Sequence, residues 1–133
     1  MSIKTSYFGM LNRKSFKGQE LNTVCIARGH RYYYGRCYPA LYPTWEMINM
    51  DGTQAEYEKA YRKGVLDKLD PLQVYEDLGE DAIMLCHEKY SDIEEGKTFC
   101  HRHIVARWLE EQLWLQYDMD VKIEELKDVK EYY

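Results

Sequence analysis

The pattern of apolar and polar positions predicts three short strands. The segment IKTSYF (residues 3–8) partly alternates, NTVCIA (22–27) is compact and β-branched, and DAIMLCHE (81–88) is almost continuously apolar in its middle. Short apolar runs bounded by turn residues are typical of strands buried on both faces, as in a parallel sheet covered by helices. The three segments are therefore expected to share one sheet, with the second and third strands parallel.

A helix is predicted between the second and third strands, over TQAEYEKAYRKGVLDKL (53–69). Thr53 is followed three positions later by Glu56, which is the pattern of a capping box. Apolar side chains then recur every four residues and form one stripe along the helix; they are Tyr57, Tyr61, Val65 and Leu69. Gly64 lies inside this segment and disfavours helix, so a bend or an early end is expected there.

Three further elements follow from the same patterns. DPLQVYEDLG (70–79) predicts a short helix with Asp70 as its cap, Pro71 in its first turn and Gly79 as its stop. A longer helix follows Cys100, with one apolar face made of Ile104, Val105, Trp108, Leu109 and Leu113. DVKIEEL (120–126) is expected to be an edge strand, followed by a short solvated tail at about 127–133.

The segment 28–52 is long, aromatic and interrupted by prolines and glycines. It predicts a tyrosine-rich loop, and a loop of this length in a compact domain is usually functional or mobile. The order strand, loop, helices, strand, helix, strand predicts one layered α/β domain over residues 1–133.

Composition narrows the class of protein. The net charge of −5 argues against a general binder of duplex nucleic acid, which would show a basic face. No apolar run approaches the length of a membrane helix, and the N-terminal residues do not resemble a signal peptide, so a cytoplasmic protein without a membrane partner is expected. In that compartment the four cysteines are expected to be free thiols. Cys25 and Cys86 lie in apolar runs, whereas Cys37 and Cys100 lie in polar segments and are the candidates for chemistry.

Polar side chains follow the predicted strands where those strands end. ARGHR (27–31) follows the second strand, CHEK (86–89) ends the third, and FCHRH (99–103) opens the next helix. The carboxyl ends of parallel strands meet at one edge of an open sheet, where ligands bind. A binding site is therefore expected at this edge.

The first hypothesis for this edge is an anion site. A helix N-terminus offers backbone N–H groups and a partial positive charge, and Arg28 and Arg102 could add bidentate contacts to a phosphate or carboxylate. The alternative is structural: Arg102 pairs with Glu88 or with a carboxylate of the acidic segment SDIEEG (91–96).

Two other hypotheses use the same residues. Cys100 at the helix start could be a thiolate nucleophile with His101 or His103 as its base, although neighbours on a helix point in different directions. A zinc site could draw on Cys86, His87, Cys100, His101 and His103, but their spacing is not that of the usual paired zinc motifs.

The run RYYYGRCY (31–38) offers aromatic rings with Arg31 and Arg36 beside them. Such rings could stack on a base, with an arginine reaching a phosphate. The alternative is a loop that covers the core. A tyrosine-rich surface could also serve as a protein-interaction module, since tyrosine combines an apolar body with a polar tip.

Several segments, taken in order, resemble the domain of unknown function 488 family. Its members typically combine a short strand ending in arginine, a helical middle region, a strand reading L-L-C-x-E, and C-H-R at a helix start. The corresponding segments here are VCIARG (24–29), YPTWEMI (42–48) leading to EYEKAYRKGVL (56–66), IMLCHEKY (83–90) and FCHRHIVARWL (99–109).

The resemblance implies a compact Rossmann-like α/β domain with a small, mostly parallel sheet flanked by helices. It also implies that Arg28, Glu88, Cys100, His101 and Arg102 gather at one site, and it implies no established reaction. The chain departs from the family pattern in its tyrosine-rich loop and in His87, which stands where an aromatic or small residue is common.

The sequence thus favours binding of a small phosphorylated or nucleotide-like ligand at the carboxyl edge of the sheet. Residues Arg28, Glu88, Cys100, His101 and Arg102 are the expected contacts. The alternative is an enzyme acting on such a ligand, with Cys100 as nucleophile or Glu88 and His101 as acid and base. No cofactor or oligomeric state is indicated.

Overall fold

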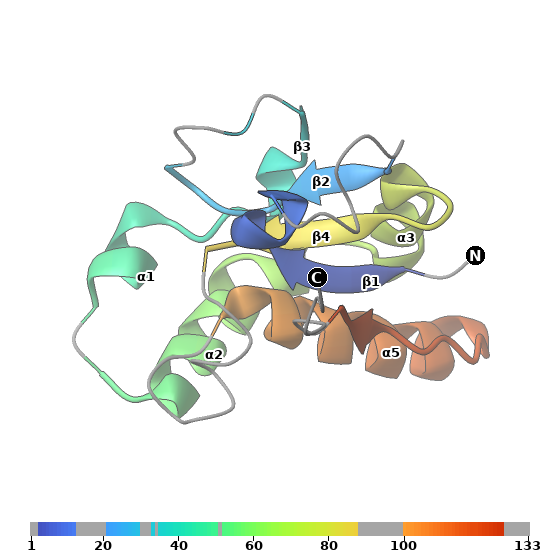
Figure 1. Cartoon of the computed structure of the whole chain (residues 1–133). Helices are drawn as coiled ribbons and strands as arrows, with labels where there is room; N and C mark the ends of the chain where they lie inside the picture. Colours follow the sequence, from blue (N-terminus) through green and yellow to red (C-terminus); the bar gives the residue numbers. More distant parts are fainter. Residues whose placement is uncertain are drawn as a thin grey trace.

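The protein folds around one parallel β-sheet, as a computed structural model shows (Figure 1). The structure describes residues 3–12, 21–29, 33, 35–50, 52–87 and 100–126. Its strands are β1 (Lys4–Tyr7), β2 (Thr23–Cys25), β3 (Arg36–Cys37), β4 (Ile83–Cys86) and β5 (Glu124–Glu125). They pair in the order β3-β2-β4-β1-β5, and every pairing is parallel. The predicted sharing of one sheet by the three apolar segments is confirmed.

Strand register places one row of side chains on the face that the helices cover. Val24 pairs with Met84, Met84 with Thr5, and Thr5 with Glu125. Paired residues of neighbouring strands point to the same face, and so do residues two apart along a strand. Val24 and Met84 pack in the main hydrophobic core, and Cys86 lies two residues beyond Met84. Cys86 and Glu125 are therefore on the helix side of the sheet.

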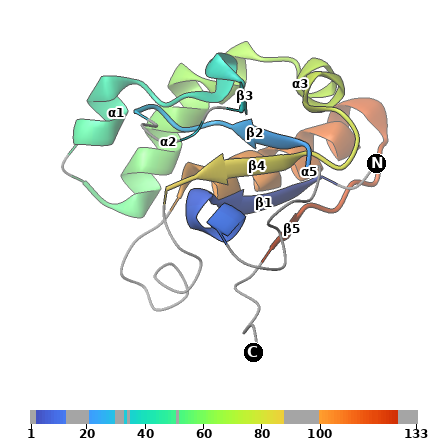
Figure 2. The same ribbon diagram turned by 45° about the horizontal axis from the view of Figure 1, so that its top comes forward.

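The α-helices are α1 (Trp45–Asn49), α2 (Gln54–Gly64), α3 (Pro71–Leu78) and α5 (His101–Tyr117). Each contributes side chains to the same core as Val24 and Met84, and Figure 2 shows α5 passing behind β4 and β1. Short 3-10 turns connect these elements: η1 (Phe8–Asn12), η2 (Pro39–Leu41) and η3 (Leu66–Lys68). The protein is thus a single α/β, Rossmann-like domain.

The helix ends lie where the local signals predict them. Thr53 accepts a hydrogen bond from the backbone of Glu56, whose side chain returns to Thr53 and completes the capping box. The helix ends at Gly64, as its low helix propensity suggests. Asp70 caps α3 through the backbone N–H of Leu72, and Gly79 stops it with a φ of 86° that favours glycine.

The described part of segment 28–52 contains β3, η2 and α1, where the sequence predicted a tyrosine-rich loop. Thr44 caps α1 by accepting a hydrogen bond from the backbone of Met47. The element was missed because five residues are too few for a helical periodicity to emerge.

The predicted edge strand at the C-terminal end is confirmed in a shorter form, since β5 lies at the edge of the sheet beside β1. The tail at 127–133 lies outside the described residues. None of the helices in the described part of the chain is long and apolar enough to cross a membrane.

Candidate functional site

A cavity of about 320 Å³ lies at the carboxyl edge of the sheet. Residues just after β2, at the end of β4 and at the start of α5 line one side: Ala27, Arg28, Cys86, His87, Cys100 and His101. The other side comes from residues 43–57, including Met47, Ile48 and Tyr57. The three polar segments that follow the strands therefore do contribute to one cavity.

Arg28 lies at this cavity and is held in place by its neighbours. Its Nε donates a hydrogen bond of 2.8 Å to the carbonyl oxygen of Pro43. Its guanidinium carbon is 5.6 Å from the ring centre of Tyr42 and 5.4 Å from that of Trp45, which is within cation–π range. The side chain is thus oriented by one hydrogen bond, donated by Nε, and by two aromatic rings.

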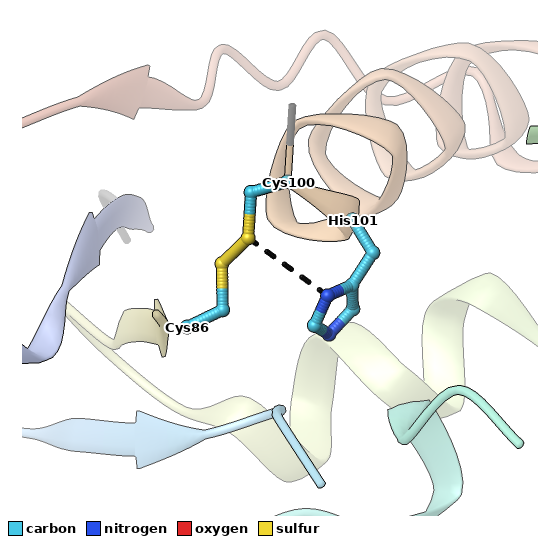
Figure 3. A group of neighbouring side chains, drawn as sticks. All are labelled: Cys86, Cys100 and His101. Carbon is cyan, nitrogen blue, oxygen red and sulfur yellow. Dashed lines mark hydrogen bonds between the residues drawn. A yellow bond between two sulfur atoms is a disulfide. The ribbon is translucent and has the colours of Figure 1, made fainter. Parts of the chain in front are cut away.

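Cys86 and Cys100 are joined by a disulfide (Figure 3). The expectation of four free thiols was therefore wrong for this pair, whereas Cys25 and Cys37 are not part of a disulfide. The pairing arises because Cys86 ends β4 on the helix side of the sheet and Cys100 is the N-cap residue of α5. Both side chains are buried. The Cys25 thiol packs in the same cluster, and burial raises its pKa to about 11.

His101 lies beside the two sulfurs. Its Nδ1 is 3.9 Å from Sγ of Cys100 (Figure 3). Its Nε2 is 2.6 Å from the carbonyl oxygen of Ile26. Sequence neighbours meet here because Cys100 is not helical: its φ of −134° and ψ of 141° are extended, which turns its side chain toward His101. Adjacent residues within a helix point in different directions, but Cys100 precedes the helix, so its side chain can approach that of His101.

Burial keeps His101 neutral near pH 7. Desolvation lowers its pKa to about 4, and the nearby charge of Arg102 acts in the same direction. A carbonyl oxygen only accepts hydrogen bonds, so the neutral ring carries its hydrogen on Nε2 and leaves a lone pair on Nδ1. That lone pair faces Cys100.

Arg102 is fully buried and forms a two-point ion pair with Glu125 of β5. Its Nε and Nη2 donate to Oε1 and Oε2 of Glu125 at 2.9 and 2.8 Å. Thr5 and His103 also contact Oε1 of this carboxylate, at 2.6 and 2.9 Å. Burial alone would raise the pKa of Glu125, but these hydrogen bonds and the charge of Arg102 outweigh it and lower that pKa.

The same guanidinium also reaches the disulfide. Nη1 of Arg102 donates to Sγ of Cys86 at 3.0 Å. Arg102 does not line the cavity. Its described contacts are those of a structural ion pair, and the carboxylate in that pair is Glu125. The Glu88 side chain and the acidic segment 91–96 lie outside the described residues.

In the described part of the tyrosine-rich run, Tyr33 and Tyr38 pack against clusters of buried hydrophobic residues. Tyr33 shares a hydrogen bond with Thr23, and Tyr38 donates to Asp77. Arg36 donates to the carbonyl oxygen of Asp77 at 2.9 Å, near the end of α3, and does not line the cavity. Arg31 lies outside the described residues.

Two contributions to the site were not expected from the sequence. Glu125 was assigned only to an edge strand, and nothing in its local pattern indicates a buried partner. Trp45 and Tyr42 belong to a segment that was interpreted as loop. Two aromatic residues close to Pro43 in the sequence could have indicated a place where a cationic side chain packs.

Comparison with known proteins finds no matching family model, no similar curated protein and no similar solved structure. The resemblance to the domain of unknown function 488 family remains an expectation drawn from its motifs.

Proposed function

We propose that this protein binds a small phosphorylated or nucleotide-like ligand in the cavity at the carboxyl edge of the sheet, as a cytosolic ligand-binding domain. The observation that carries the proposal is Arg28. Its guanidinium is oriented at the cavity by Pro43, Tyr42 and Trp45, and an oriented guanidinium can hold a phosphate through two parallel hydrogen bonds.

The opposite wall suits the rest of such a ligand. Ile48 lines the cavity with 42% of its surface exposed, and Trp45, which packs on Arg28, is 57% exposed. Aromatic and aliphatic side chains next to one cationic group are typical of sites that bind an apolar or aromatic body with an anionic end. A base or similar ring could pack on Tyr57 or Ile48, which line the cavity, while its phosphate contacts Arg28.

The proposed contacts differ from those expected on sequence grounds. Arg28, Cys100 and His101 line the cavity and are retained as ligand contacts. Arg102 is not a proposed ligand contact, because its side chain is buried against Glu125. Glu88 stays in the proposal only as a residue that the sequence places near the same edge.

The test is binding of a panel of mononucleotides and sugar phosphates, followed by calorimetry on the ligands that raise the melting temperature. Arg28→Ala is expected to weaken binding about 10- to 100-fold, because one charge-assisted contact contributes about 1.5–3 kcal/mol. Arg62→Ala is the matched control. It removes one positive charge from a partly exposed pair with Glu58, away from the cavity, and should leave affinity unchanged.

Equal affinity for Arg28→Ala and the unmodified protein contradicts the proposal. Mass spectrometry on the same incubations separates binding from catalysis. A ligand returned intact supports a binding protein. A converted ligand favours the second candidate function, in which Cys100 in its reduced form attacks the ligand beside His101, whose Nδ1 lies 3.9 Å from its sulfur.

A further inference from the structure

The geometry points to a transition-metal site, of the kind that holds Zn²⁺, formed by Cys86, Cys100 and His101 when the two cysteines are reduced. Their ligand atoms, two sulfurs and Nδ1, all lie within 4.8 Å of one another, and all three residues are buried. The metal site is separate from the proposed phosphate site, because none of the three metal-binding side chains depends on Arg28.

The three donors match the chemistry of zinc. Thiolate and imidazole are its preferred ligands, with bonds of about 2.3 Å to sulfur and about 2.0 Å to nitrogen. The residues lie far apart in the sequence, at 86 and at 100–101, which is why no zinc motif is visible in the chain. The fold brings them together because β4 ends beside the first turn of α5.

His101 is already oriented as a metal ligand. A ligating histidine usually donates its other ring N–H to a backbone carbonyl or a carboxylate, which fixes the ring and its tautomer. Here Nε2 bonds to the carbonyl oxygen of Ile26 at 2.6 Å, and the Tyr61 ring packs against the imidazole at 5.5 Å. The free lone pair of Nδ1 then faces the two sulfurs (Figure 3).

The backbone spacing of the two cysteines suits an ion between their sulfurs. Their Cα atoms are 7.0 Å apart, slightly beyond the usual disulfide range of about 4.4–6.8 Å. Two sulfurs bound to one tetrahedral ion are about 3.8 Å apart, given bonds of about 2.3 Å, so they need a wider separation than a disulfide does. Reduction therefore allows an ion to fit without drawing β4 and α5 together.

Charge is balanced when the ion is bound. Reduction of the disulfide by an added phosphine, which takes up the oxygen of a water molecule and leaves its two protons to the sulfurs, or by a dithiol, which becomes a disulfide, gives two thiols. Binding of Zn²⁺ then releases both protons, and the two thiolates cancel the charge of the ion. Arg102 and Glu125 already neutralise each other, and Nη1 of Arg102 donates to Sγ of Cys86, which stabilises that sulfur as thiolate.

Three protein ligands leave one position of a tetrahedral ion open. Cys86, Cys100 and His101 all line the cavity, so the fourth position faces its interior, where a water or a ligand oxygen can bind. Closed structural zinc sites have four protein ligands, whereas three ligands and an open position are typical of catalytic zinc.

The experiment uses the full chain reduced with a phosphine and titrated with Co²⁺, which reports on its ligands through its absorption spectrum. One Co²⁺ is expected to bind per chain, with the sulfur-to-cobalt charge-transfer band of thiolate ligation, and Zn²⁺ should displace it. Cys100→Ser and His101→Gln should each weaken binding by at least about 10-fold. His101→Gln leaves both sulfurs intact and keeps a side-chain N–H for Ile26.

Cys37→Ser is the matched control, since it removes a thiol outside the cluster and should not change the spectrum. The oxidised protein should show no charge-transfer band. Circular dichroism checks that each variant is folded. If Cys100→Ser does not fold, the Co²⁺ affinity of His101→Gln alone tests the site. A reduced protein without the band, or one whose band is unchanged in the folded variants, overturns the site. Phosphate-ligand binding is measured separately with chelator present, so the two proposals can fail independently.

Discussion

Arg102 places a permanent positive charge inside the protein, and Glu125 is the carboxylate that balances it. The two side chains are 0% and 8% exposed, and two parallel hydrogen bonds join them. A buried charge left without its partner is costly because neither water nor a counter-ion replaces the lost contact. The same residue that the sequence suggests as an anion ligand is therefore expected to matter most for folding.

Arg102→Ala is predicted to lower the free energy of unfolding by about 3–5 kcal/mol, since it leaves Glu125 buried beside Thr5 and His103. Chemical denaturation of the oxidised protein measures the loss. Arg62→Ala, at an ion pair whose side chains are 26% exposed, should cost less, about 1 kcal/mol. In the double variant Arg102→Ala/Glu125→Ala the loss should be well below the sum of the single losses. Additive losses would mean that the two side chains do not stabilise each other.

At the scale of elements, the sequence predicts what local rules determine. The caps Thr53 and Asp70, the glycines at the ends of α2 and α3, and the apolar runs of β2 and β4 are each decided within a few residues. β3 and α1 were missed because two and five residues carry no measurable periodicity. Their structure depends on neighbours that are distant in the chain, such as the register of Cys25 with Cys37.

The capping box of α2 is predicted to contribute about 1 kcal/mol to the free energy of unfolding. Thr53→Ala removes the oxygen that accepts from the backbone N–H of Glu56, at 3.2 Å, and leaves that N–H without its cap. Thr53→Ser keeps the hydroxyl and is the control. Urea denaturation should show a loss of about 0.5–2 kcal/mol for the alanine variant and little change for serine. A serine variant as unstable as the alanine variant would show that the hydroxyl is not what matters.

At the scale of the whole molecule, the site depends on the order of strands, which the sequence does not reveal. Arg102 meets Glu125 only because β5 pairs with β1, and Cys86 meets Cys100 only because β4 is central and α5 begins at its end. Sequence reasoning could place polar segments at one edge of a parallel sheet, since this follows from strand direction alone. It could not decide which of those side chains face the cavity and which face each other.

The stability that the edge strand β5 contributes is predicted to depend on pH through Glu125. Hydrogen bonds from His103, Arg102 and Thr5 lower the folded-state pKa of its carboxyl, so the unfolded chain binds this proton more readily. The carboxylate therefore contributes stability above the unfolded pKa of about 4.5, and this stability is lost as the pH falls through the folded pKa. Denaturation curves between pH 6 and pH 3 should show the free energy of unfolding decreasing in acid.

Glu125→Gln should weaken that acid dependence, because a neutral amide has no proton to gain, while lowering stability at pH 6 through the loss of the buried charge pair. The matched control is Glu124→Gln, which changes the exposed neighbour on the same strand and should leave the acid dependence as it is. If Glu124→Gln flattened the curve as much as Glu125→Gln, the acid sensitivity would belong to the net charge of the surface. A difference between the two neighbours would instead assign it to the buried contacts that hold β5 against β1 and α5.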